Sequence, residues 1–150
     1  MTEHLLCRAQ WVPRPVGEIF AFFSLPSNLR RLTPPWLDFH MTEARAELQA
    51  GSIIHYKLRV RGIPVRWTSE IAEWIPPHRF VDIQISGPYS LWHHEHRFTS
   101  ERDGTRIDDT VRYALPFGPL GRWMHRIVVR RDLERIFAYR QEKIRELFGE

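Results

Sequence analysis

Cysteine is nearly absent from this sequence, since Cys7 is the one cysteine among 150 residues. A single cysteine excludes an internal disulfide and any metal site built from several cysteines, and it fits a reducing compartment. Cys7 alternates along the chain with the apolar Leu5 and Ala9. We therefore expect Cys7 to be a small buried side chain on a strand.

Long apolar runs are also missing. No segment approaches the about 20 apolar residues that a membrane-spanning helix needs. The first residues, Met1-Thr2-Glu3-His4, lack the charged region and apolar run of a signal peptide. These absences predict a soluble, cytoplasmic protein.

The sequence carries no motif for phosphate or nucleophile chemistry and only a small excess of charge. There is no Gly-rich phosphate loop and no Gly-x-Ser-x-Gly string. Lys and Arg number 22 against 18 Asp and Glu, a formal net charge of +4. This bias permits acidic partners but requires none. Nucleic-acid binding would need a larger basic patch with aromatic readers, so we expect no nucleic-acid partner.

Apolar and aromatic residues, in contrast, are plentiful. Hydrophobic residues make up 43% of the chain and aromatic residues 13%. Such a composition predicts a folded globule, and 150 residues suffice for a sizeable core without cross-links. We expect a single domain over residues 1–150.

The order of predicted elements is a strand, two short helices, about six further strands and one long helix. Apolar spacing and turn residues delimit them. The strands are expected at 3–12, 37–45, 54–61, 65–75, 79–86, 89–100 and 106–115, and the short helices at 15–24 and 27–32, the second capped by Ser27. Residues 116–121 are expected to form a loop. A helix of more than 25 residues is expected from about 121, with a stripe at Leu133, Phe137, Arg140, Ile144 and Leu147.

This order predicts the α+β class, with six to seven antiparallel strands in a curved sheet. The apolar face of such a sheet must be covered, and the long C-terminal helix is the one predicted element long enough to cover it. A bent sheet wrapped around a helix leaves a hollow between the two. We therefore expect an internal cavity.

Several local strings are distinctive. They are Arg14-Pro15-Val16 to Phe22-Phe23, Leu32-Thr33-Pro34-Pro35-Trp36, Gly62-Ile63-Pro64, Pro76-Pro77-His78-Arg79-Phe80, Gly87-Pro88-Tyr89 with Trp92 to Phe98, and Asp109 to Tyr113 before Pro116-Phe117-Gly118. These strings resemble those of the START/Bet v 1-like (SRPBCC) superfamily, in particular its bacterial polyketide cyclase/dehydrase-type branch of uncharacterised ligand-binding proteins. The resemblance implies the helix-grip fold. The superfamily includes lipid carriers, hormone receptors, aromatic cyclases and co-chaperones, so the fold does not determine the activity.

Alternation along the strands indicates which side chains face the cavity. One informative string is Trp92-His93-His94-Glu95-His96-Arg97-Phe98. On a strand, the apolar Trp92 and Phe98 share one face with the imidazoles of His94 and His96. An apolar wall with a few polar groups is typical of small-molecule pockets. The same reasoning on the neighbouring elements predicts these ligand-binding residues: Trp67, Phe80, Asp82, Gln84, Trp92, His94, His96, Phe98, Asp109, Val111, Tyr113 and Phe137.

Four interpretations of the inward polar groups stay open. They can satisfy one another by hydrogen bonds, or orient the polar end of a ligand. They can catalyse, with His94 or His96 as a general base beside Asp82 or Asp109. They can also hold a metal ion, although His94 and His96 alone are a weak signal without a third ligand. We expect no metal and no cofactor, and we do not favour an enzyme.

The predicted function is to bind, carry or sense a small hydrophobic or amphipathic molecule, similar to a lipid or polyketide, in an internal cavity. The alternatives are a cyclase or dehydratase and an interaction module with a filled core. The chain is expected to be a monomer or homodimer. Phe117, Leu120, Trp123 and Met124 lie beside several arginines, and the favoured interpretation is a packed loop before a solvated helix, rather than a membrane contact.

Overall fold

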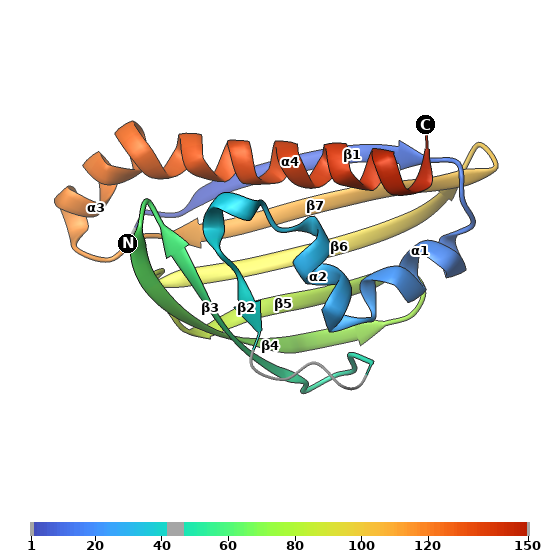
Figure 1. Ribbon diagram of the computed structural model, residues 1–150, viewed down its shortest axis with the longest axis horizontal. Coiled ribbons are helices and arrows are strands. Elements are labelled where there is room, and N and C mark those ends of the chain that lie inside the picture. The colour runs from blue at the N-terminus through green and yellow to red at the C-terminus, as the bar shows by residue number, and fades with distance from the viewer. Residues whose placement is uncertain (1, 42–46, 150) are drawn as a thin grey trace.

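The computed structural model describes residues 2–41 and 47–149 of the chain. Within these residues seven antiparallel strands form one curved sheet in the order β1-β7-β6-β5-β4-β3-β2 (Figure 1). The strands are β1 His4–Val12, β2 His40–Met41, β3 Ile53–Val60, β4 Ile63–Ile75, β5 Arg79–Ser86, β6 Leu91–Glu101 and β7 Gly104–Ala114. The predicted helix-grip architecture is confirmed.

Two short helices follow the first strand, as predicted. They are α1 (Val16–Phe23) and α2 (Pro26–Leu32), and a single 3-10 turn, η1 (Pro35–Leu37), comes next. Ser27 does not cap α2, because the helix begins one residue earlier at Pro26. Proline suits that position, since its fixed φ is helical and its missing N–H would be unpaired there anyway.

The predicted strand at 37–45 is largely wrong in the part that the structure describes. Only β2 is extended there, because η1 occupies its start and Asp38 turns the chain with a left-handed φ of 46°. Positions 42–45 of that prediction lie outside the described residues.

The C-terminal segment is helical from Gly118 to Phe148. It comprises α3 (Gly118–Met124), a π-helical turn η2 (His125–Val129) and α4 (Arg130–Phe148). The helix thus begins three residues before the predicted start, so the predicted loop at 116–121 is too long. Figure 1 shows the long helix running alongside β1 and over the curved sheet, and α4 also contacts α2.

The burial predicted for Cys7 is wrong: Cys7 is exposed, and the neighbouring Leu5 is 64% exposed. The polar face of β1 turns inward instead. Arg8 donates a hydrogen bond to the side chain of Gln141 on α4 at 2.8 Å, and Gln10 donates one to the Gln141 carbonyl at 2.9 Å. Hydrogen bonds therefore attach the edge strand to the helix, in addition to the packing of Leu6 against the cluster that contains Leu133 and Phe137.

The interior contains two clusters of buried apolar side chains. The first lies between α1 and the sheet and includes Phe20, Phe80 and Phe98. The second lies under α4 and includes Trp67, Trp92 and Phe137. No helix among the described residues is both long and apolar enough to cross a membrane.

Candidate functional site

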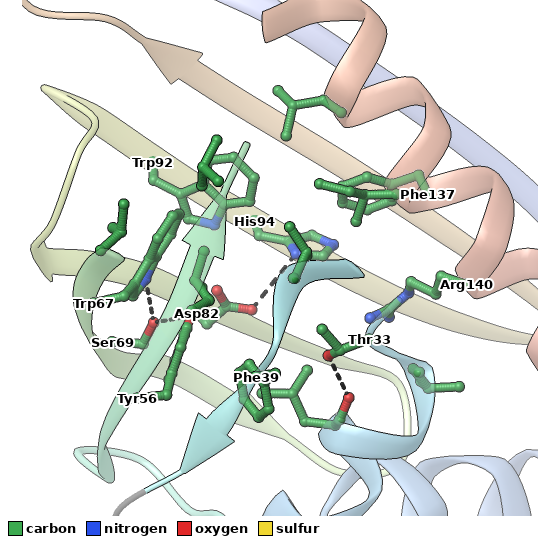
Figure 2. Close-up of a pocket in the computed structure, with 18 of the residues that line it drawn as sticks. Thr33, Phe39, Tyr56, Trp67, Ser69, Asp82, Trp92, His94, Phe137 and Arg140 are labelled. Carbon is green, nitrogen blue, oxygen red and sulfur yellow. Dashed lines mark hydrogen bonds and ion pairs between the residues drawn. The ribbon is translucent and has the colours of Figure 1, made fainter. Parts of the chain in front are cut away.

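A cavity of about 650 Å³ lies between the inner face of the sheet, the segment from α2 to η1, and α4. Figure 2 shows its side chains projecting from these three sides toward a common interior. Its wall is predominantly apolar, and the volume falls in the range of about 300–1,000 Å³ that is usual for ligand pockets. The alternative of a filled core does not describe this interior.

Seven of the twelve residues predicted to bind ligand line the cavity. They are Trp67, Phe80, Asp82, Trp92, His94, His96 and Phe137. The two-residue repeat of β4, β5 and β6 and the helical repeat of α4 bring them together.

The other five do not line it. Phe98 and Val111 are buried in the apolar clusters. Asp109 lies beneath the wall, and the hydroxyl of Tyr113 lies 2.7 Å from Nε2 of His125. Gln84 folds back onto the β5–β6 connection, where its side-chain amide both donates to the carbonyl and accepts from the N–H of Tyr89.

The polar side of the cavity is built around two histidines and two aspartates from adjacent strands. His94 Nε2 lies 2.8 Å from Asp109 Oδ1, and His96 Nε2 lies 2.6 Å from Asp82 Oδ2. The two imidazole rings stack with centroids 3.7 Å apart. Arg140 enters from α4, with Nη2 at 3.4 Å from Asp109 Oδ1 and 3.3 Å from His96 Nδ1.

These histidines also connect the two apolar clusters. The His96 ring stacks on Phe80 at 4.0 Å, and the His94 ring lies edge-on to Phe137 at 5.5 Å. Both imidazoles are buried, with exposures of 4–5%. Each ring is thus held by apolar packing as well as by its hydrogen bonds.

Burial and charge oppose each other at the aspartates. Burial alone would raise the pKa of Asp109, but Arg140 and the hydrogen bonds from both imidazoles hold the pKa well below its ordinary value. The pKa of Asp82 is also lowered, because its imidazole neighbours and Arg140 outweigh its burial. Both carboxyl groups are therefore ionised at neutral pH.

The two histidines are shifted in opposite directions. Burial and the neighbouring His96 lower the pKa of His94. Burial also acts against protonation of His96, but its bonds to Asp109 and Asp82 prevail and raise its pKa. His94 therefore favours the neutral imidazole, whereas His96 takes up a second proton more readily than a free imidazole does.

This charge assignment determines the tautomer of His94. An ionised carboxylate only accepts hydrogen bonds, so the proton of His94 lies on Nε2, which donates to Asp109. Nδ1 of His94 then carries a lone pair. Its distance to Asp82 Oδ2 is 3.7 Å, too long for a hydrogen bond.

Arg140 is the main site residue that the sequence prediction missed. It lines the cavity, is 7% exposed, and lies 5.2 Å from the centre of the Phe23 ring. Its Nε is buried and has no hydrogen-bond partner among the described residues. The signal was present in the sequence, because a single charged residue interrupts the apolar stripe of the C-terminal helix.

A second polar group lies on β3 and β4, next to Asp82, and was also missed. Ser69 Oγ accepts a hydrogen bond from Trp67 Nε1 at 2.8 Å and lies 3.2 Å from the hydroxyl of Tyr56 (Figure 2). Burial raises the pKa of Tyr56, so its hydroxyl stays neutral. Neutral hydroxyl groups from β3 and β4 therefore lie beside the charged groups of Asp82, His94, His96 and Arg140.

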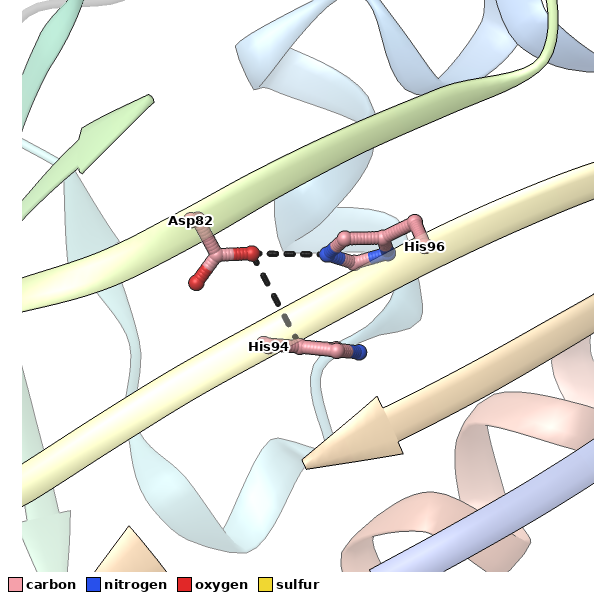
Figure 3. Close-up of side chains that lie close together, drawn as sticks. All are labelled: Asp82, His94 and His96. Atoms are coloured by element: carbon pink, nitrogen blue, oxygen red, sulfur yellow. Dashed lines mark hydrogen bonds and ion pairs between the residues drawn. The ribbon is translucent and has the colours of Figure 1, made fainter. Parts of the chain in front are cut away.

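Asp82, His94 and His96 are also the described residues whose arrangement could hold a metal ion. One ligand atom from each lies within 4.8 Å of the others, and Figure 3 shows the carboxylate of Asp82 facing both imidazoles. From the sequence we expected no metal, because His94 and His96 alone are a weak signal for a metal site. In the folded chain a carboxylate from the next strand joins them.

A curved antiparallel sheet that grips a long helix around an apolar cavity defines the helix-grip class of ligand-binding folds. The sequence pattern of the family described as "Polyketide cyclase / dehydrase and lipid transport" matches residues 12–138, and the chain belongs to this family. The resemblance inferred from local strings is thereby confirmed. No curated protein sequence is similar enough to count as a relative.

Solved structures share the fold at low sequence identity. Protein CV1439 from Chromobacterium violaceum is 11% identical with a TM-score of 0.73, over 97% of each chain. Protein Ms6760 from Mycobacterium smegmatis is 16% identical with a TM-score of 0.70, over 95% of this chain and 89% of that one. The ginseng major latex-like protein 151 from Panax ginseng is 10% identical with a TM-score of 0.68, over 97% of each chain. These similarities establish the fold alone.

Proposed function

We propose that this protein binds a small amphipathic molecule in its cavity. The apolar body would lie against the aromatic walls, and an oxygen-bearing end would face Arg140 and His94. The observation that carries this proposal is a cavity of about 650 Å³ with a predominantly apolar wall, into which the buried polar side chains of His94, His96 and Arg140 are set. Membership in a family described by polyketide and lipid substrates supports it.

Arg140 favours a ligand whose polar end is an acid or a carbonyl. A buried donor without a partner costs about 1–3 kcal/mol, and a ligand oxygen near the guanidinium would offset that cost. The remaining charges of the cluster are already paired: Asp82 with His96, and Asp109 with His94 and Arg140. Arg140 is therefore the group most available to a ligand oxygen.

Two measurements test this function. Native mass spectrometry of protein purified from cells should show a co-purified small molecule that denaturation releases. A fluorescent fatty acid and its methyl ester should both bind, the acid more tightly. The substitution Arg140→Met should weaken binding of the acid by about ten- to a hundredfold and of the ester far less, since a hydrogen bond to a charged group contributes about 1.5–3 kcal/mol.

Arg66→Met is the matched control, because Arg66 is an exposed arginine on β4 next to a cavity residue. It should leave both affinities unchanged. Equal losses for acid and ester in Arg140→Met would refute the assignment of the polar end. A protein that binds neither probe and carries no molecule from cells would refute the function itself.

A second candidate, a cyclase or dehydratase, is favoured by one observation. His94 is neutral, Asp109 orients it, and its free Nδ1 belongs to a residue of the cavity wall. A nitrobenzisoxazole, whose ring opens when a base removes its carbon-bound proton, is a suitable probe. Wild-type protein should open it faster than His94→Gln does, and equal rates would exclude His94 as a base.

Ligand can reach the cavity from an acidic membrane surface. Phe117, Leu120 and Trp123 are 78, 58 and 53% exposed, so the packed loop expected from the sequence is wrong. Exposed Arg122 and Arg126 lie on the same helical segment, and Met124 lines the cavity. Apolar side chains beside arginines suit the surface of a membrane that contains anionic lipids.

Vesicle flotation tests this contact. Wild-type protein should float with vesicles that contain phosphatidylserine and not with vesicles of phosphatidylcholine alone. Trp123→Ser should reduce flotation, whereas Ile85→Ser, which removes an equally exposed apolar side chain from β5, should not. Flotation that is absent or insensitive to Trp123→Ser would contradict the contact.

A further inference from the structure

Three groups that commonly bind metals converge at the polar wall of the cavity. The geometry points to a site for a divalent transition-metal ion, with Nδ1 of His94, Nε2 of His96 and one carboxylate oxygen of Asp82 as its ligands (Figure 3). Two histidines and one carboxylate form a known ligand set for zinc and for non-haem iron. The inference goes beyond the proposed binding function and does not depend on it.

The distances between the three groups are close to those of a coordinated site. Bonds of about 2.1 Å at angles between an octahedral and a tetrahedral value place ligand atoms about 3.0–3.4 Å apart. Asp82 Oδ2 lies 2.6 Å from His96 Nε2 and 3.7 Å from His94 Nδ1, and one ligand atom of each residue lies within 4.8 Å of the others. Small shifts of these side chains would therefore bring both carboxylate–imidazole distances into this range.

The bonding on the far side of His94 also fits. Metal-binding histidines usually donate their other N–H to a carboxylate, which sets the tautomer and the ring orientation. His94 Nε2 lies 2.8 Å from Asp109 Oδ1, so that buried carboxylate leaves Nδ1 free to face Asp82. Nδ1 of His96 lies 3.4 Å from Asp109 Oδ1 and 3.3 Å from Arg140 Nη2, which leaves Nε2 of His96 toward Asp82.

Without an ion, one contact of this cluster is unsatisfied. The lone pair of His94 Nδ1 and the ionised Asp82 face each other as two acceptors, and only His96 places a proton on Asp82. A cation between the three groups would bind all of them. The same wall borders the cavity, so positions around the ion would remain open to a small molecule.

The charges around the site also favour a cation. Asp82 on β5 and Asp109 on β7 face the two imidazoles, and Arg140 on α4 is the one cation beside them among the described residues. Two carboxylates against one guanidinium leave a negative charge that a divalent ion would neutralise.

The test uses the whole protein, free of any affinity tag and treated with a chelator, and the probes Co²⁺ and Zn²⁺. Equilibrium dialysis should show one ion per chain, and Co²⁺ should develop the visible absorption of a site with nitrogen ligands. Mg²⁺ should not compete, because it prefers oxygen ligands. His94→Ala and Asp82→Asn should each weaken binding by more than about a hundredfold.

Two controls exclude other histidines. His93 lies on the opposite face of the same strand, and the His4 ring stacks on His125 at 3.4 Å. His93→Ala and His4→Ala should leave binding unchanged. Absence of stoichiometric binding, or binding that survives His94→Ala and Asp82→Asn, would overturn the inference.

A measurement on the wild-type chain covers the case in which a variant fails to fold. Nitrogen chemical shifts of the imidazoles, recorded with and without Zn²⁺, should change at Nδ1 of His94 and Nε2 of His96. Unchanged shifts at these two nitrogens would also overturn the inference. Both tests use the metal alone, so their outcome is separate from that of the lipid-binding experiments.

Discussion

Arg61 and Asp132 join the β3–β4 turn to α4 by two hydrogen bonds. Arg61 Nε donates to Asp132 Oδ2 at 2.9 Å, and Nη2 donates to Oδ1 at 2.8 Å. Arg61 adopts a left-handed φ of 52° and Gly62 one of 83°, as a two-residue hairpin turn requires. Both partners line the cavity, so the ion pair spans part of its wall.

Breaking this ion pair should accelerate ligand exchange. Arg61→Gln removes the charge at an exposed position, so stability should change little while a bound fluorescent fatty acid dissociates several-fold faster. Stopped-flow displacement measures the rate. Asp132→Asn should give the same acceleration, and the double substitution should add little to either. Arg66→Gln is the control, and an Arg61→Gln rate equal to the wild-type rate would contradict this role.

The hydroxyl of Ser69 should matter for stability out of proportion to its size. Ser69→Ala removes the acceptor of Trp67 and the partner of Tyr56, which leaves two buried polar groups unpaired. The expected loss in the free energy of unfolding is about 1–3 kcal/mol. Thr68→Ala, on the other face of β4, should cost less than about 0.5 kcal/mol. Chemical denaturation of the three proteins checks this, and equal losses would show that the hydroxyl pairing is unimportant.

Strand alternation was sufficient to place both histidines on the inner face of the sheet. His94 and His96 share a face with Trp92 and Phe98, and regular pairing of β6 with β7 keeps this face inward over the whole strand. The prediction worked because both neighbours of β6 are strands and no bulge interrupts its pairing with β7. A curved sheet covered by the C-terminal helix followed from the same patterns together with the long C-terminal stripe, and the helix-grip fold followed from the resemblance.

Alternation failed where another interaction outweighed apolar burial. On β1 the polar Arg8 faces inward because α4 offers it hydrogen-bond partners, and Cys7 is therefore exposed. On β4 a register shift between Ile71 and Glu73 ends the regular alternation, so Trp74 rather than Glu73 packs against Phe20. Such shifts depend on three-dimensional pairing and leave no clear signal in one strand's sequence.

The opposite pKa shifts of the two cavity histidines predict a specific pH dependence. The pKa of His96 is raised, so its stabilising contribution is complete below the unfolded value of about 6.5 and is lost as pH rises through its folded pKa. His94 acts in the other direction: its pKa is lowered, so stability falls as pH drops from about 6.5 toward its folded value. The free energy of unfolding should therefore decline both as pH rises through the folded pKa of His96 and as pH falls below about 6.5.

Substitution separates the two effects. His96→Gln should abolish the decline on the alkaline side, which is at most about 1.4 kcal/mol per pH unit for one proton. His94→Gln should reduce the decline on the acidic side. Denaturant unfolding between about pH 5 and 9 measures both slopes. If His96→Gln kept the alkaline decline, another group would have to be its source.

Asp109 should be the most important single carboxylate for stability. It is 5% exposed and accepts from His94 at 2.8 Å, with Arg140 at 3.4 Å. Asp109→Asn keeps the shape but removes the negative charge, which leaves Arg140 buried without its counter-ion. Breaking a buried ion pair from one side costs about 3–5 kcal/mol.

The adjacent Asp108 pairs with Arg106 on the outer face, so Asp108→Asn should change stability little. Thermal and denaturant unfolding of the two variants compare the charges directly. A loss in Asp109→Asn no larger than that in Asp108→Asn would show that the buried network contributes no more to folding than a surface ion pair.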